Sequence, residues 1–155
     1  MATSSILGAI PGHPPRSLPG VDYSTDLQSA GEAAQKKWVT KSLPEGMYVG
    51  TFGLTACTGF ALCDPDARIG SLAHFDASGS SADIQAMLSE MRSMGAQDAR
   101  IRVIIAGYPA FNMTALGVYD SLLKAAPHLK KSLTVYQGRD QLLLFGDGRV
   151  GYFND

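Results

Sequence analysis

The pattern of hydrophobic and polar positions changes near residue 46. Residues 1–20 carry prolines at positions 11, 14, 15 and 19 and few large apolar side chains. Such a composition buries too little apolar surface to offset the entropy lost on ordering. We therefore expect residues 1–42 to form a flexible arm, with at most a short helix over residues 26–39. Residues 43–155 are expected to form the folded domain.

Alternating apolar and polar positions predict the strands of that domain. Residues 47–52 and 58–62 alternate well enough for two strands, and residues 68–75 are expected to return antiparallel after the Asp64-Pro65-Asp66 turn. A run of apolar residues over 101–105 predicts a buried strand. The C-terminal part predicts three further strands, with Gly146-Asp147-Gly148 as a hairpin turn between the last two: 133–137, 141–145 and 150–153.

Helical spacing of apolar residues is clearest after residue 80. Ser80 and Ser81 offer N-caps, Gly95 is placed to end the helix, and one apolar stripe runs between them: Ile84, Met87, Leu88, Met91 and Met94. A second helix is predicted over residues 114–125, before Pro127. The elements together predict an α+β fold, a layered β-sheet core with helices packed on it.

Composition narrows the classes of function. Of 155 residues, 45% are hydrophobic and 17% are charged, and the net charge of −1 leaves no concentrated basic face for nucleic acid. No apolar run approaches the length needed to span a bilayer, and the first residues lack the features of a cleavable secretory signal. We therefore expect a protein that binds neither nucleic acid nor membrane and that is cytoplasmic.

The two cysteines are expected to be free thiols. Cys57 and Cys63 lie six residues apart in a predicted strand, so their Cα atoms should be roughly 20 Å apart, too far for a disulfide. Cys63 has no companion set of metal ligands in the sequence, and we expect no metal and no organic cofactor.

The candidate chemistry is a thiol beside an imidazole. Small residues surround Cys57, which would let another chain approach the sulfur and leave backbone N–H groups free for an oxyanion. His74 closes a predicted apolar strand, whereas His13 and His128 are expected to face solvent. In the predicted hairpin Cys57 and His74 come close together, where the imidazole could take the thiol proton. The alternative for each residue alone is a buried structural role.

The segment Gly50–Cys57, Asp64 and the segment Ile69–His74 together resemble the core motif of the CheD family of chemoreceptor glutamine deamidases. The similarity extends over roughly residues 45–153. It implies the CheD-like cysteine hydrolase fold, shared with the cytotoxic necrotizing factor and Burkholderia lethal factor toxins. It also implies that Cys57 is the nucleophile, that His74 is its partner and that Thr51 orients His74, with a protein glutamine as substrate.

Two departures from the chemotaxis pattern point toward the toxin group. Phe75-Asp76-Ala77 follows His74 where the chemotaxis enzymes carry an apolar run, and Ala106-Gly107-Tyr108-Pro109 replaces a pair of glycines and alanine. The partner protein is therefore either a chemoreceptor or a host signalling or translation protein. In the second case the N-terminal arm would suit export into a host cell without a cleavable signal.

Several alternatives remain open at the level of sequence. A catalytically idle binding module could share the fold, and a thiol protease or transglutaminase could share the Cys–His chemistry. Asp76 is a second candidate for the group that orients His74, with the capping of a turn as its structural alternative. Arg139 and Asp140 are expected to form a structural turn.

Overall fold

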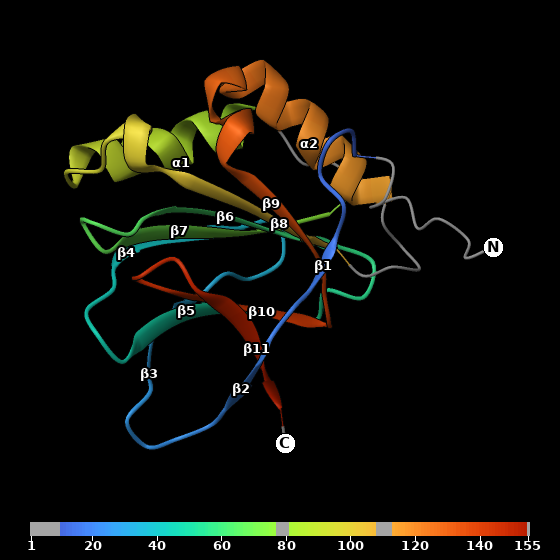
Figure 1. The fold of residues 1–155 in the computed structure, drawn as a ribbon. Helices are drawn as coiled ribbons and strands as arrows, with labels where there is room; N and C mark the ends of the chain where they lie inside the picture. Colours follow the sequence, from blue (N-terminus) through green and yellow to red (C-terminus); the bar gives the residue numbers. More distant parts are fainter. Residues whose placement is uncertain (1–9, 77–80, 108–112, 155) are drawn as a thin grey trace.

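Two mixed β-sheets and a layer of helices form an α+β architecture (Figure 1). The computed structural model describes residues 10–76, 81–107 and 113–154. The helices cover one face of the larger sheet, and the smaller sheet packs on the other face (Figure 1). The order of layers is therefore helices, six-stranded sheet and five-stranded sheet.

The six-stranded sheet contains the hairpin that was predicted from the sequence. Its central strands pair antiparallel, and β1, β9 and β8 pair parallel. Across the sheet the order is β1 (Arg16–Ser17), β9 (Leu133–Gln137), β8 (Arg102–Gly107), β6 (Thr58–Asp64), β7 (Ile69–Phe75) and β4 (Trp38–Ser42).

The five-stranded sheet combines the C-terminal strands with N-terminal ones. Strand β5 lies between β10, its antiparallel neighbour, and β3, its parallel neighbour. The order is β2 (Gly20–Asp22), β11 (Val150–Asn154), β10 (Gln141–Phe145), β5 (Met47–Phe52) and β3 (Gln28–Glu32). Every strand predicted from residue 47 onward is confirmed to within a few residues.

The two predicted helices are confirmed as α1 (Ser81–Ser93) and α2 (Met113–Ala125). The 3₁₀ helices η2 (Asp98–Arg100) and η4 (Pro127–Ser132) were not predicted. Four members of the predicted stripe on α1, residues 84, 87, 88 and 91, are buried against the sheet. The placement of Met94 in that stripe is wrong, because α1 ends at Ser93 and Met94 is 42% exposed. Gly95 follows with φ +111°, the conformation that ends many helices.

Apolar side chains fill both spaces between the layers. One cluster packs α1 and α2 on the six-stranded sheet, with Phe60, Leu62 and Ile105 at its centre. A second cluster lies between the two sheets and includes Val49, Leu72 and Leu142. Because strand residues alternate between faces, neighbours on β6 and β7 contribute to different clusters. This alternation decides which side chains meet between the sheets.

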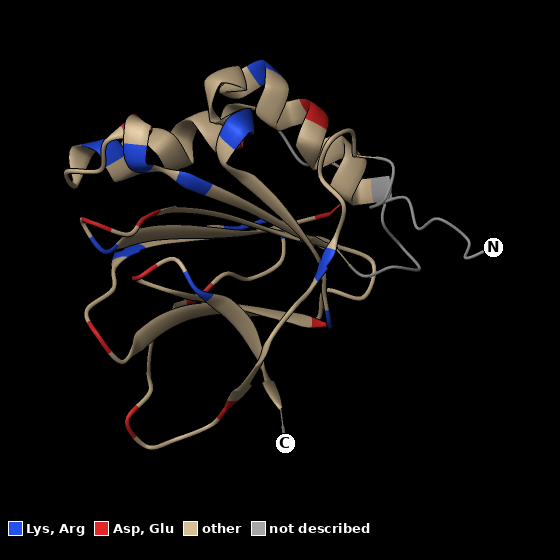
Figure 2. Cartoon of the chain, viewed as in Figure 1, with Lys and Arg blue, Asp and Glu red and all other residues tan. Residues whose placement is uncertain are grey.

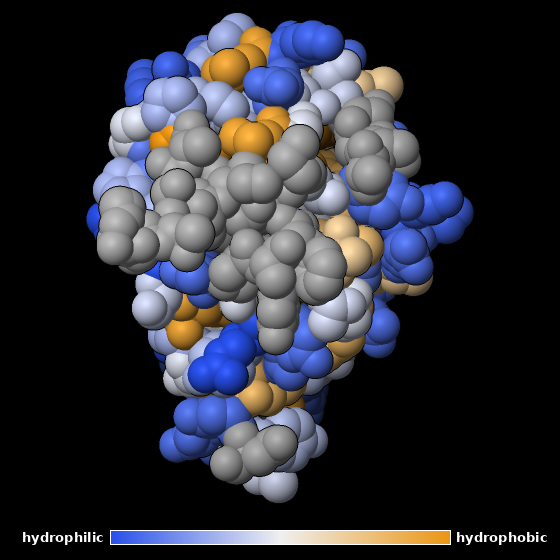
Figure 3. All heavy atoms as spheres, turned by 90° about the vertical axis from the view of Figure 1, so that its right-hand side faces the viewer, coloured by the Kyte–Doolittle hydropathy of each residue, from blue (hydrophilic) through white to orange (hydrophobic). Residues whose placement is uncertain are grey.

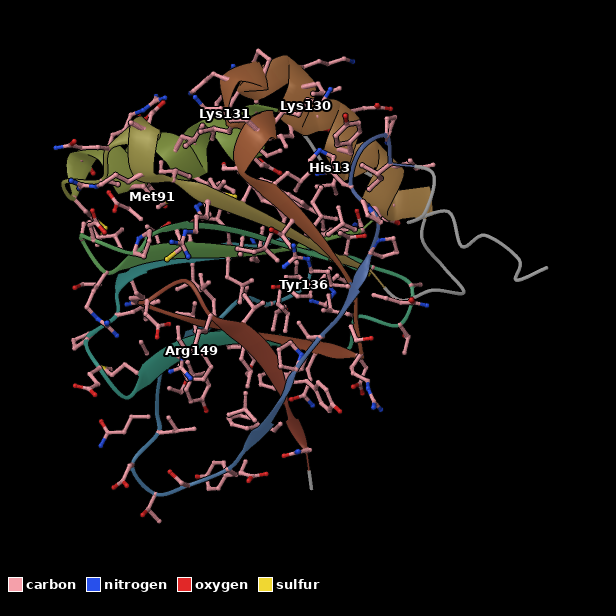
Figure 4. All side chains as sticks on the ribbon, viewed as in Figure 1. His13, Met91, Lys130, Lys131, Tyr136 and Arg149 are labelled. Carbon is pink, nitrogen blue, oxygen red and sulfur yellow. The ribbon has the colours of Figure 1, made fainter. Side chains whose placement is uncertain are left out.

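The N-terminal region is where the prediction from sequence is wrong. Residues 16–42 carry the four strands β1 to β4, and residues 26–39 form parts of β3 and β4 and not a helix. Ile10 is 2% exposed and belongs to the cluster under the helices, where the His13 ring lies 6.4 Å from that of Tyr119 on α2 (Figure 4). Within the described part of the chain, the expected arm is thus built into both sheets. The short strands escaped prediction because their partners, not their own periodicity, hold them.

A buried carboxylate fixes the far end of the β6–β7 hairpin. Asp64 is fully buried and accepts hydrogen bonds from the backbone of Asp66, Ala67 and Gln97. It also accepts hydrogen bonds from the guanidinium of Arg100: Nη2 lies 2.8 Å from Oδ2, and Nε lies 3.0 and 3.1 Å from the two carboxylate oxygens. Burial alone would raise the pKa of this carboxyl, but the hydrogen bonds outweigh it and lower the pKa.

Charged residues lie mainly on the loops and the helices (Figure 2). The strands of both sheets are largely free of charge in that view, as expected for surfaces buried between layers. In the ranges that the structure describes, no helix is long and apolar enough to cross a membrane.

Candidate active site

Cys57 lies in a tight turn at one end of the space between the sheets. This turn belongs to the connection from β5 to β6, which lies at the right-hand end of the molecule in Figure 1. The Cys57 N–H donates to the carbonyl of Leu54 at 3.1 Å, and the Leu54 N–H donates to the carbonyl of Asp140 at 2.8 Å. Gly53 begins the turn with φ +75°, a conformation that favours glycine. The turn is thereby fixed to the start of β10, and Cys57 is 7% exposed.

His74 comes from the neighbouring strand, on the same face of the sheet as Cys57. Residue 74 of β7 is the register partner of Gly59 on β6, two residues after Cys57. Cys57 packs in the cluster between the sheets, as does Leu72, which shares a face of β7 with His74. Cys57 directly precedes β6, so both side chains face the space between the sheets near the open end of the hairpin.

Thr51 reaches His74 from the other sheet. The Oγ1 atom of Thr51 lies 2.8 Å from Nδ1 of His74 and 2.7 Å from the carbonyl oxygen of Ala33. Thr51 and His74 are 0% and 3% exposed, so both hydrogen bonds are shielded from water. The structure thus brings together two of the three residues singled out in the sequence.

The hydrogen bonds of Thr51 fix which ring nitrogen of His74 carries the proton. A hydroxyl has one hydrogen, and the Ala33 carbonyl can only accept, so Thr51 donates to Ala33. At the other contact Thr51 must then accept, and Nδ1 of His74 must be the donor. Neutral His74 consequently has its proton on Nδ1 and a lone pair on Nε2.

The Nε2 atom of His74 has no hydrogen-bond partner among the described residues, although it is buried. Cys57 Sγ lies on the same face of the sheet as His74 but is not hydrogen-bonded to Nε2. A buried, unpartnered acceptor is uncommon in proteins and often has a functional reason. Contacts between nucleophile and base are also often long before substrate binds.

Burial sets the ionisation of the pair. It raises the pKa of the Cys57 thiol, and the negative charge of Asp76 raises this pKa further. Burial also lowers the pKa of His74, while the charges of Asp76 and Glu32 act in the opposite direction. Both shifts favour the neutral forms, so the site holds a thiol and a neutral imidazole at pH 7, not a preformed ion pair.

Asp76 does not take the place of the orienting group. The Nδ1 position of His74 is occupied by Thr51, and the carboxylate of Asp76 lies 3.5 Å from Nζ of Lys36. Arg139 stacks its guanidinium on the ring of Tyr152 at 4.5 Å and donates to its hydroxyl. These contacts fit the structural role expected for the residues around position 139.

The carbonyl of Ala33 is the part of the site that the sequence did not indicate. Ala33 lies just after β3, where its own N–H donates to the carbonyl of Gly50 at 2.9 Å. A main-chain acceptor has no residue-type signal, and the segment was expected to be a mobile arm. A correct pairing of β3 with β5 would have been needed to find it.

Backbone N–H groups of the Cys57 turn are only partly available. The N–H of Cys57 is engaged with Leu54, so it is not free in this conformation to hold an oxyanion. The N–H groups of Thr55 and Ala56 donate to no acceptor within the described ranges. They are therefore the candidate oxyanion donors of this turn.

Figure 3 shows the end of the molecule at which this turn lies. Hydrophobic and hydrophilic residues are interspersed over the described surface there. Among the residues that the structure describes, no group of three or more His, Cys, Asp or Glu could hold a metal ion.

No protein-family model matches the chain, and no curated protein matches it in sequence.

Proposed function

We propose that this protein is a thiol hydrolase that deamidates a glutamine side chain of a partner protein. Cys57 would be the nucleophile, His74 the general base and Thr51 the residue that orients His74. The observation that carries the proposal is the buried, unpartnered Nε2 atom of His74. Thr51 fixes the tautomer that leaves a lone pair on this atom, and His74 lies on the same face of the sheet as Cys57.

The reaction starts from the neutral pair. Nε2 of His74 takes the thiol proton as Cys57 Sγ attacks the carboxamide carbon, and the carbonyl oxygen becomes an oxyanion facing the turn. The proton on Nε2 then passes to the nitrogen, the C–N bond breaks and ammonia leaves a thioester. Water attacks the thioester with His74 as base, the C–S bond breaks, and the products are glutamate and the free thiol.

Two observations support a side-chain amide of a protein as the substrate. The residues of the site match the order and spacing of the CheD-like motif, whose resemblance implies a protein glutamine. The thiol is 7% exposed at the end of a space between two sheets, which suits an extended side-chain amide better than a bulky group. The substrate would be a chemoreceptor or a host signalling or translation protein.

Mass spectrometry of candidate substrates tests the proposal. Chemoreceptor cytoplasmic domains, small GTPases and translation factors would each be incubated with the wild-type protein and with Cys57→Ala. We expect a gain of about 1 Da at one glutamine, absent with Cys57→Ala, because only the thiol route converts the amide to an acid. If no substrate gains mass, and Cys57→Ala captures the same partner as the wild type, the binding-module alternative replaces the proposal.

A further inference from the structure

The loop between β3 and β4 contacts both strands that carry the site. The Ala33 N–H donates to Gly50 of β5, and the Ala33 carbonyl accepts from Thr51. On the other side, the N–H of Lys36 donates to the carbonyl of His74 at 2.8 Å, and the N–H of His74 donates to Lys37 at 3.0 Å. Five residues thus connect a strand of one sheet to a strand of the other.

The conformation of this loop is unusual at Lys36. Its φ is +66°, in the left-handed region that costs energy for a side chain other than glycine, asparagine or aspartate. Glycine would adopt it without strain, yet the position carries a lysine. Its Nζ lies 3.5 Å from the Asp76 carboxylate, and its side chain is 66% exposed.

Asp76 is the acid through which this ion pair can influence the thiol. The last register pair of the hairpin is Thr58 with Phe75, and Cys57 and Asp76 are the residues that directly flank it outside the two strands. The charged groups that act on the pair Cys57 and His74 are Asp76, Glu32 and, through Asp76, Lys36.

We propose that the β3–β4 loop is a positioning element of the site, in which Lys36 offsets the charge of Asp76 next to Cys57. The backbone of the loop holds His74 and Thr51 in register. The ammonium of Lys36 reduces the effect of the Asp76 carboxylate, whose negative charge disfavours the thiolate form of Cys57. The step that this favours is the formation of a thiolate at Cys57. The inference deepens the proposed function, and the catalytic role of the loop rests on that function. The effect of Lys36 on the ionisation of the thiol does not.

The experiment measures the rate of alkylation of Cys57 by iodoacetamide as a function of pH. Cys57→Ala provides the baseline, which removes any contribution of Cys63. Lys36→Gln should move the midpoint of the profile to higher pH and reduce the rate at pH 8 about twofold, a size that exposed ion pairs allow. Lys36→Arg keeps the charge and should restore the wild-type profile.

Two comparisons separate this effect from a general disturbance. Lys37→Gln removes the adjacent cation, for which the structure shows no ion pair in its described part, and should leave the midpoint unchanged. In the background of Asp76→Asn, Lys36→Gln should cause no further shift, because the charge that it offsets is gone. Equal shifts for the two lysines, or a Lys36 effect that persists without Asp76, would overturn the inference.

The outcome does not depend on deamidation. Should the expected profile be found in a protein that deamidates no substrate, the positioning element stands and the proposed function fails. If deamidation occurs and the profile does not respond to Lys36, the loop has no electrostatic role and the proposed function stands.

Discussion

At the scale of single residues, the site depends on one hydroxyl proton. Because Thr51 gives its hydrogen to Ala33, it can only accept from His74, and this leaves Nε2 unprotonated. A threonine and a main-chain carbonyl thus do what a carboxylate does in a Ser-His-Asp triad, which is to hold one tautomer. They add no negative charge, so they do not raise the pKa of the imidazole as a carboxylate would.

Removing the Thr51 hydroxyl should allow both tautomers of the His74 ring to be populated. In Thr51→Val the shape of the side chain is kept but no oxygen can accept from Nδ1, whereas Thr51→Ser retains the hydroxyl. Nitrogen-detected NMR of the His74 ring should show the Nδ1–H tautomer in the wild type and in Thr51→Ser, and a mixture in Thr51→Val. An unchanged tautomer in Thr51→Val would mean that another group fixes the ring.

The acidic limb of the pH–rate profile tests the role of His74 as a base. Burial lowers the pKa of His74, so the neutral base persists below pH 6.5, the ordinary midpoint of a histidine. The rate should therefore be retained as pH falls through 6.5 and be lost only when pH falls below the lowered pKa of His74, as kcat/KM for the free enzyme reports. A limb centred above 6.5 would show that the imidazole is not desolvated.

At the scale of elements, the β6–β7 hairpin is held at both of its ends. The near end carries Cys57 and His74, and the far end contains the buried Asp64 carboxylate with Arg100. The sequence showed this hairpin clearly because both strands are rich in apolar residues and the Asp-Pro-Asp turn is strong. It showed Asp64 as a turn residue and as part of the motif, but not its pairing with Arg100, which lies 36 positions away.

Asp64 should be far more important for stability than its neighbour in the turn. Asp64→Ala leaves Arg100 and three backbone N–H groups without their acceptor, and we expect a loss of about 3 kcal/mol in the free energy of unfolding. Asp66→Ala, at a side chain that is 72% exposed, should cost under about 1 kcal/mol. Urea unfolding measures both values, and similar losses would contradict the assignment.

The same carboxylate predicts a dependence of stability on pH. Its pKa is lower in the folded protein than in the unfolded chain, so its contribution is present above pH 4 and is lost as pH falls. In Asp64→Asn the dependence between about pH 5 and 2 should be reduced. An unchanged slope of stability against pH would assign the acid sensitivity to other carboxyls.

At the scale of the whole molecule, the N-terminal region decides how the layers meet. Strands β1 and β4 complete one sheet, and β2 and β3 complete the other. Tyr136, labelled in Figure 4, packs against the cluster that fills the space between them. The sequence predicted the central strands and helices because their periodicity is intrinsic. Short strands rich in glycine, serine and lysine carry no such pattern, and neither does a loop whose role is to offer a carbonyl.

Ile10 tests whether this region belongs to the folded core. Ile10→Ala should destabilise the protein by about 2–4 kcal/mol, because it removes a side chain that is 2% exposed beneath the helices. Met94→Ala, at a 42% exposed position, should change the free energy of unfolding by less than about 1 kcal/mol. Equal effects in thermal unfolding would indicate that the N-terminal region is only loosely attached.

The central claim is that Cys57 transfers a glutamine acyl group to water, and isotope labelling tests it most directly. A partner protein that is deamidated would be incubated in water enriched in oxygen-18 with the wild type, Cys57→Ala or His74→Gln. The masses of its glutamine-containing peptides would then be measured. The account predicts a gain of about 3 Da at one glutamine with the wild type only, since the new carboxylate oxygen comes from water. A peptide bond cleaved, an amine attached to the glutamine, or the same gain with Cys57→Ala would contradict it.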